Sequence, residues 1–126
     1  MAEAIKLLLV DDETRVRAGL RMRLELEPDL AIAGEAGNGV EALKLVQDIR
    51  PDVVVMDVRL PGMDGLTAMQ GLYERIGPVP VIVITAYGDP ANRLVGKLQG
   101  IHSYLIKPFT SDEIEKIVTQ ALASRN

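Results

Sequence analysis

The 126-residue sequence has no cysteine, no tryptophan and a single histidine, His102. Disulfides, a thiol nucleophile and a zinc site of the usual cysteine and histidine type are therefore excluded. A histidine-based catalytic triad would need His102 itself, which we expect at the surface. Any bound metal must have oxygen ligands, which favours Mg2+ or Ca2+. A chain of this length buries enough surface to fold without crosslinks, so we expect residues 1–126 to form a single domain.

Aromatic and basic residues are also scarce. Aromatics make up 3% of the chain, and 14 Lys and Arg stand against 18 Asp and Glu, a formal net charge of -4. Nucleic-acid binding needs a basic surface, and single strands need stacking rings, so we expect no direct binding of nucleic acid. The apolar run Leu7 to Val10 is too short for a membrane span or a signal-peptide core and is followed by acids. We therefore expect a cytoplasmic protein without membrane contact.

What the sequence does contain is an alternation of short apolar runs with helix-length segments. Such runs are typical of buried parallel strands and lie at Ile5 to Val10, Leu30 to Ala36, Val53 to Met56, Val79 to Ile84 and Tyr104 to Ile106. Strands that alternate with helices are joined by right-handed crossovers, with helices on both faces of the sheet. The sequence thus predicts an α/β fold with five parallel strands and five helices in a three-layer sandwich.

The helix signals differ in strength along the chain. In the last predicted helix, Thr110 and Glu113 have the spacing of a capping box. An apolar stripe follows, made of Ile114, Ile117, Val118, Ala121 and Leu122. The predicted fourth helix, Pro90 to Gln99, is weak because Gly96 inside it costs about 1 kcal/mol relative to Ala.

The segment from Val16 to Leu26 is ambiguous, because its apolar residues alternate with mostly charged ones as in a strand. Its length, its composition and the i, i+4 spacing of Arg21 and Glu25 favour a helix. As a helix it carries two opposite apolar rows, Val16/Leu20/Leu24 and Ala18/Met22/Leu26. Only one row can face the sheet, so the other is either exposed or part of a partner surface.

Chemically active side chains follow four of the five predicted strands. They are Asp11 with Asp12, Asp57, Thr85 and Lys107. In an open parallel sheet the carboxyl ends of the strands share one rim, where ligands bind. Three close carboxylates repel one another unless a cation lies among them, and their oxygens suit Mg2+. An Asp carboxylate can also attack phosphorus, while Mg2+ and Lys neutralise the phosphoryl oxygens.

Each of these residues also has an ordinary structural explanation. Asp12 could simply cap the following helix, Asp57 could belong to a turn, and Lys107 could be a solvated charge. Because they gather at one rim of the predicted sheet, a shared site explains them together better than separate structural roles do.

Together these residues make the sequence similar to the receiver domain of two-component response regulators. The resemblance covers essentially the whole chain and rests on Leu9 to Glu13, Pro51 to Asp57, Leu60 to Gly65, Thr85-Ala86 and Tyr104 to Phe109. It implies a doubly wound, flavodoxin-like sheet with strand order 2-1-3-4-5. It also implies a signalling domain that is phosphorylated by a sensor histidine kinase. Such a domain catalyses its own phosphorylation and slow dephosphorylation but is not an enzyme on external substrates.

The resemblance further assigns roles to the residues of the rim. Asp57 would accept the phosphoryl group. Asp12, Asp57 and the main-chain carbonyl of Arg59 would bind Mg2+, with Asp11 acting through water. Lys107 and Thr85 would hold the phosphoryl oxygens, and Ala86 would offer its backbone N–H.

The resemblance also implies a switch near the fifth strand. Tyr104 matches the aromatic residue whose inward or outward position accompanies phosphorylation, and the Lys107-Pro108 bond would be cis. The expected output surface is the fourth helix, the fifth strand and the fifth helix. The sequence departs from the family at Ile101, where a smaller Ala is usual, and Arg59 and Tyr87 flank the acceptor at positions that vary in the family.

Two other functions compete with this interpretation. Gly37 to Ala42 matches the G-x-G-x-x-A pattern of dinucleotide-binding sites, and Asp57 lies 20 residues after Gly37 (57 − 37). The motif follows the second strand instead of the first, however, and turn formation explains both glycines. A phosphatase with an aspartyl phosphate intermediate is the other alternative, but such enzymes place a second Asp two residues after the nucleophile, where this chain has Arg59.

The expected partners are the kinase and an output domain or downstream protein. Arg15 to Gly39 resembles receivers joined to a helix-turn-helix output domain of the LuxR type, which suggests the N-terminal domain of a transcriptional regulator. The Ala18/Met22/Leu26 row could also join the fifth helix in a phosphorylation-dependent homodimer.

Overall fold

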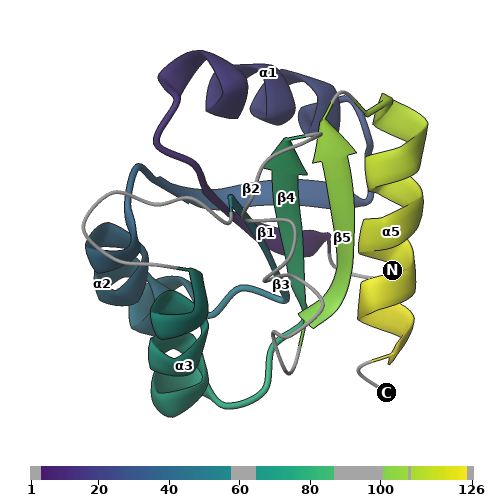
Figure 1. Cartoon of the computed structure of the whole chain (residues 1–126). Coiled ribbons are helices and arrows are strands. Elements are labelled where there is room, and N and C mark those ends of the chain that lie inside the picture. Colours follow the sequence, from purple (N-terminus) through teal and green to yellow (C-terminus); the bar gives the residue numbers. More distant parts are fainter. Residues whose placement is uncertain (1–3, 58–64, 87–100, 108, 125–126) are drawn as a thin grey trace.

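The computed structural model describes residues 4–57, 65–86, 101–107 and 109–124. Its elements are β1 (Ile5–Val10), α1 (Thr14–Glu25), β2 (Leu30–Ala36), α2 (Gly39–Ile49), β3 (Val53–Asp57), α3 (Gly65–Ile76), β4 (Val81–Ala86), β5 (Ile101–Lys107) and α5 (Ser111–Ser124). The strands form one sheet in the order β2-β1-β3-β4-β5, and every neighbouring pair is parallel. The predicted parallel sheet and its order are confirmed (Figure 1). The predicted fourth helix, Pro90 to Gln99, lies outside the described residues.

The sheet separates two hydrophobic cores. Leu8 and Val10 of β1 pack into a core that α2 and α3 cover, while Leu7 and Leu9 face a second core under α1 and α5. Figure 1 shows the same division, with α2 and α3 together on one side of the sheet. Because successive strand residues point to opposite faces, a continuous apolar run such as β1 can fill both cores. This is the predicted three-layer sandwich.

The strand boundaries agree with the predicted apolar runs for β1 and β2 and differ at one or both ends for the other strands. β1 and β2 begin and end as predicted, but the fourth strand begins at Val81 instead of Val79. Val79 is buried, and Pro80 after it has no N–H to give to a ladder, although its carbonyl accepts from Val54 N at 3.0 Å. β5 runs beyond the predicted Tyr104 to Ile106, because backbone pairing with β4 extends to Ile101 and Ser103 before this run and to Lys107 after it.

The ambiguous segment after β1 is a helix, as predicted. Leu20 and Leu24 of α1 are 4% and 1% exposed, whereas Met22 and Leu26 are 67% and 81% exposed. The Val16/Leu20/Leu24 row therefore faces the sheet, and Val16 packs against the core under α1 and α5.

Helix caps follow the sequence signals in α5 but not in α1. Thr110 N donates to Glu113 Oε1 at 3.2 Å and Glu113 N donates to Thr110 Oγ1 at 3.1 Å, so the predicted capping box is confirmed. The alternative that Asp12 caps α1 is wrong, since the cap residue is Glu13 and no side-chain hydrogen bond caps this helix. Asp12 therefore lacks the structural role that competed with a role in a site.

We predict that the two rows of α1 differ sharply in stability. Leu24→Ala should lower the free energy of unfolding by about 2 to 5 kcal/mol, because it opens a cavity in a packed core. Met22→Ala, the control two residues away, should change it by less than about 0.5 kcal/mol. Urea unfolding of both variants measures the difference. Equal losses would show that α1 does not bury the Leu24 row.

Candidate functional site

Three acidic side chains meet at the carboxyl edge of the sheet. β1 and β3 are neighbours, with Val10 paired with Met56, so the next residues, Asp11 and Asp57, lie side by side at the ends of the two strands. Carboxylate oxygens of Asp11, Asp12 and Asp57 all lie within 4.8 Å of one another. We call these three residues the acidic cluster. The predicted convergence of the three carboxylates is thus observed.

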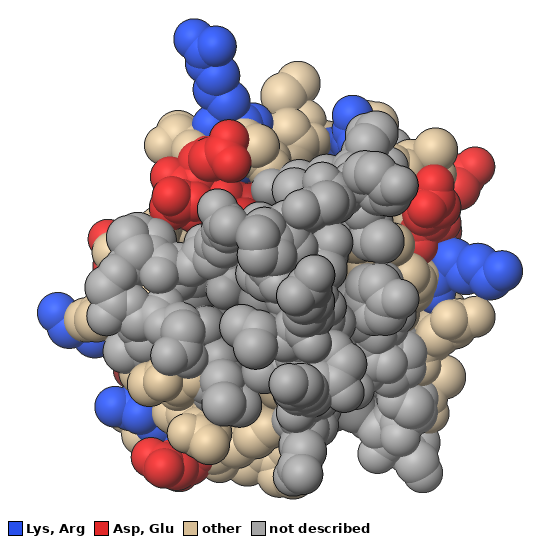
Figure 2. Space-filling model, viewed as in Figure 1, with Lys and Arg blue, Asp and Glu red and all other residues tan. Residues whose placement is uncertain are grey.

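The members of the acidic cluster differ in burial. Asp11 is 2% exposed and Asp57 is 8% exposed, whereas Asp12 is exposed. Figure 2 shows acidic side chains gathered at the upper left of one face, in the part of the view where α1 begins. The acidic cluster thus combines one exposed and two buried carboxylates.

The backbone at the end of β1 fixes the first carboxylate. Asp11 N donates to Ala36 O at 3.0 Å, which continues the pairing with β2 for one residue beyond the strand. Asp11 Oδ1 accepts from Glu13 N at 2.9 Å, a side-chain turn that starts the bend into α1. Both contacts hold Asp11 against the sheet while the chain turns away from it.

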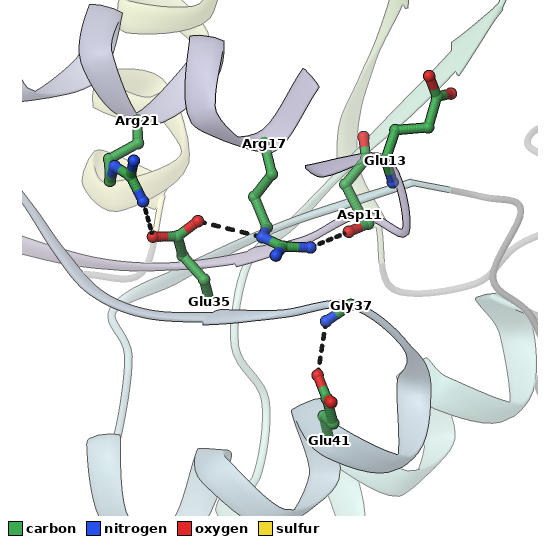
Figure 3. A network of polar contacts seen from close by, with 7 residues as sticks. All are labelled: Asp11, Glu13, Arg17, Arg21, Glu35, Gly37 and Glu41. Carbon is green, nitrogen blue, oxygen red and sulfur yellow. Dashed lines mark hydrogen bonds and ion pairs between the residues drawn. The ribbon is translucent and has the colours of Figure 1, made fainter. Parts of the chain in front are cut away.

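A second group of polar contacts lies beside Asp11, between α1 and β2 (Figure 3). Arg17 Nη1 donates to the main-chain carbonyl of Asp11 at 2.6 Å, and Arg17 Nε donates to Glu35 Oε1 at 3.1 Å. Arg21 Nη1 donates to Glu35 Oε2 at 2.7 Å, and this hydrogen bond raises the pKa of Arg21 above its usual value. We call these contacts the Arg17–Glu35–Arg21 network. The sequence alone gave no signal for this network, since only the fold brings α1 and β2 together here.

The remaining predicted residues share the same edge as far as their backbones are described. Asp57 pairs with Ile84, Thr85 with Ile106, and Ala86 with Lys107, so β4 and β5 end beside β3. The side chains of Thr85, Tyr104 and Lys107 lie outside the described part of the structure. The same holds for Arg59, Tyr87 and the Lys107-Pro108 bond.

The donor set of the acidic cluster fits a divalent cation. Its oxygens are hard ligands of the kind that Mg2+ prefers, and three carboxylates within 4.8 Å repel one another without positive charge nearby. The described residues therefore suit a Mg2+ site that keeps several waters.

The glycine motif after β2 serves to start a helix. Gly37 N donates to Glu41 Oε2 at 2.7 Å, and Glu41 N donates to Asn38 Oδ1 at 2.9 Å. A carboxylate thus already occupies the N-terminus of α2, where a dinucleotide would place its phosphates. This arrangement argues against the dinucleotide-binding alternative.

Within the described ranges, no helix has the length and apolar character needed to cross a membrane.

Comparison with known proteins gives a consistent result. The family model of the response regulator receiver domain matches residues 7–119. The response regulator Rre1 of Synechocystis is 40% identical over 125 residues, which cover 98% of this chain and 54% of that protein. A protein-glutamate methylesterase/protein-glutamine glutaminase of Pyrococcus horikoshii is 40% identical over 116 residues, covering 90% of this chain and 31% of the relative.

The fold agrees as well. The signal receiver domain of the response regulator NarL from Mycobacterium tuberculosis superposes with a TM-score of 0.86 at 32% identity, covering 97% of this chain and 98% of the other. The chain spans between about a quarter and about half of the length of the curated relatives that it matches. From the family match, the sheet order and the acidic cluster between β1 and β3, we conclude that this chain belongs to the family of response regulator receiver domains, the phosphoryl-accepting domains of two-component signalling.

Proposed function

We propose that Asp57 is the phosphoryl acceptor and that a sensor histidine kinase is the donor. The observation that carries the proposal is the place of Asp57, at the end of the central strand β3 and within 4.8 Å of two further carboxylates. A carboxylate oxygen of Asp57 attacks the phosphorus of the phosphohistidine. The bond from phosphorus to the imidazole nitrogen breaks, and the nitrogen keeps the electron pair.

The same proposal assigns the metal site. Asp12, Asp57 and the main-chain carbonyl of Arg59 hold Mg2+, and Asp11 acts through a water molecule. When bound, Mg2+ neutralises the negative charge of the phosphoryl oxygens and of the carboxylates. The buried position of Asp11 and its hydrogen bond from Glu13 N support a fixed role for this residue behind the ligands that touch the metal.

The ends of β4 and β5 supply the rest of the machinery. We propose that Thr85 and Lys107 hold the phosphoryl oxygens and that Ala86 donates its backbone N–H. Tyr104 is the switch residue, and residues 90–99, β5 and α5 form the output surface. The register that places Thr85 beyond Ile84, the partner of Asp57, supports this assignment.

The proposal extends to the chain and its partners. We propose that residues 1–126 form one receiver, that the protein is cytoplasmic, and that an output domain or downstream protein reads its state. The resemblance of Arg15 to Gly39 to LuxR-type receivers supports a transcriptional regulator. Phosphatase activity on external substrates is not expected, because Arg59 stands where such enzymes have their second Asp.

Acetyl phosphate with Mg2+ tests the acceptor. We expect intact-mass spectrometry to show one added phosphoryl group on the wild-type chain and none on Asp57→Asn, since the amide is not a nucleophile toward phosphorus. Asp48→Asn, which removes an exposed carboxylate from α2, should remain phosphorylated. Equal labelling of the wild-type chain and Asp57→Asn would contradict the assignment.

Thermal unfolding tests the metal site. Mg2+ at about 100 times its dissociation constant should stabilise the wild-type chain by about 2.7 kcal/mol, because only the folded state assembles the acidic cluster. Asp12→Asn should lose most of this gain, and without Mg2+ it should unfold at or above the wild-type temperature, because one repulsive charge is gone. A variant that retains the full gain would exclude Asp12 as a ligand.

Sedimentation tests the proposed homodimer. Met22 of α1 and Leu26, the C-cap residue of this helix, are largely exposed, so a partner could cover their row. Met22→Glu should lower the sedimenting mass of the phosphorylated form, because dimer formation would bury the new charge. An unchanged mass would rule this row out as the dimer contact.

A further inference from the structure

We propose that Arg17 is a positioning residue for the metal site, acting through the peptide bond that joins Asp11 to Asp12. The inference rests on the proposed function, since it concerns how the acidic cluster is held for Mg2+. It starts from the 2.6 Å hydrogen bond from Arg17 Nη1 to the carbonyl of Asp11.

That carbonyl belongs to the peptide group between two members of the acidic cluster. The plane of this group sets ψ of Asp11 and φ of Asp12, so a rotation of the plane moves the carboxylate of Asp12 relative to that of Asp57. Packing holds Asp11 and Asp57, which are 2% and 8% exposed, but Asp12 is exposed. The direction of the backbone sets where the Cβ of Asp12 lies, and with it the positions that the Asp12 carboxylate can reach.

Arg17 is itself held from the far side. Its Nε donates to Glu35 Oε1 at 3.1 Å, and Glu35 belongs to β2, where it pairs with Leu9 of β1. The guanidinium therefore bridges from the rigid sheet to the carbonyl of Asp11 (Figure 3). A guanidinium is planar, with donors in a fixed arrangement, so holding one end orients the other.

Lysine would not replace arginine in this bridge. An ammonium on a flexible stem is a single charged point, and it has no fixed geometry to join Glu35 to a carbonyl. Arg21 provides the natural control, since its guanidinium also binds Glu35, at 2.7 Å, whereas the hydrogen bond to the carbonyl of Asp11 comes from Arg17. The two arginines share one carboxylate and differ in whether they contact the peptide of the acidic cluster.

The experiment measures Mg2+ binding directly. Calorimetry on the unphosphorylated chain compares wild type, Arg17→Ala, Arg17→Lys and Arg21→Ala, and urea unfolding records the stability of each. We expect Arg17→Ala and Arg17→Lys to weaken Mg2+ binding by about tenfold or more and Arg21→Ala by less than about twofold, as for a residue that orients a ligand. With acetyl phosphate, Arg17→Ala should need more Mg2+ for half-maximal phosphorylation yet reach the wild-type rate at saturation.

Three results would overturn the inference. They are an Arg17→Ala variant that binds Mg2+ as wild type does, equal weakening in Arg17→Ala and Arg21→Ala, and full recovery in Arg17→Lys, which would make charge the cause instead of geometry. If Arg17→Ala does not fold, Arg17→Lys decides, because it keeps the charge and most of the length. A wild-type chain that binds no Mg2+ would instead overturn the proposed function, so the two failures are distinguishable.

Discussion

The parallel pairing of β1 with β3 is the constraint on which the site depends. Parallel strands end at the same edge of a sheet, and the register of Val10 with Met56 places the residues that follow them next to each other. Both residues are acids, so the fold forces two negative charges together, and the turn into α1 adds Asp12 as a third. The backbone ladder sets the spacing of Asp11 and Asp57, so these two residues stay neighbours whatever rotamers their side chains adopt.

The proximity of the three carboxylates lowers the stability of the folded chain and favours the binding of a divalent cation. Carboxylates that are 2% and 8% exposed have lost most of their water, and each repels the others. The polar contacts at Asp11 offset part of this cost, as a backbone N–H binds its carboxylate. A divalent cation offsets more, since it is attracted by all three charges at once. Binding of a divalent cation thus relieves the repulsion that destabilises the folded chain, and this relief adds to the affinity for the metal.

The parts of the molecule that depend on local pattern and on topology were predictable from the sequence. Apolar runs located β1 and β2 to the residue, although β2 is only partly buried along its length and its pairing with β1 shifts register after Leu7. The acidic cluster followed from topology, because strand ends share an edge. The apolar pattern did not show where strand pairing begins. Val79 is buried like a strand residue, but the paired strand starts only at Val81, after Pro80.

What pattern could not predict is contact between distant segments. Glu35 in β2 is 18 residues from Arg17, and their pairing requires α1 to lie across β2. An acid near the end of a strand and a base in a neighbouring helix are common in surface segments, so neither residue stands out alone. The i, i+4 spacing of Arg21 and Glu25 predicted the helix correctly, but it gave no sign of Glu35, which Arg21 binds in the structure.

The Arg17–Glu35–Arg21 network contributes geometry more than stability. Its side chains are 19% to 41% exposed, and ion pairs of this kind add only about 0 to 1 kcal/mol each because water screens them. The fold is instead stabilised mainly by burial of apolar surface in the two cores. Those cores end at the carboxyl edge of the sheet, where side chains must be polar for the site to work. At this edge, hydrogen bonds from Glu13 N and Arg17 hold the Asp11 carboxylate and the peptide group between Asp11 and Asp12 in place, as packing holds Leu8 and Leu9 in the cores.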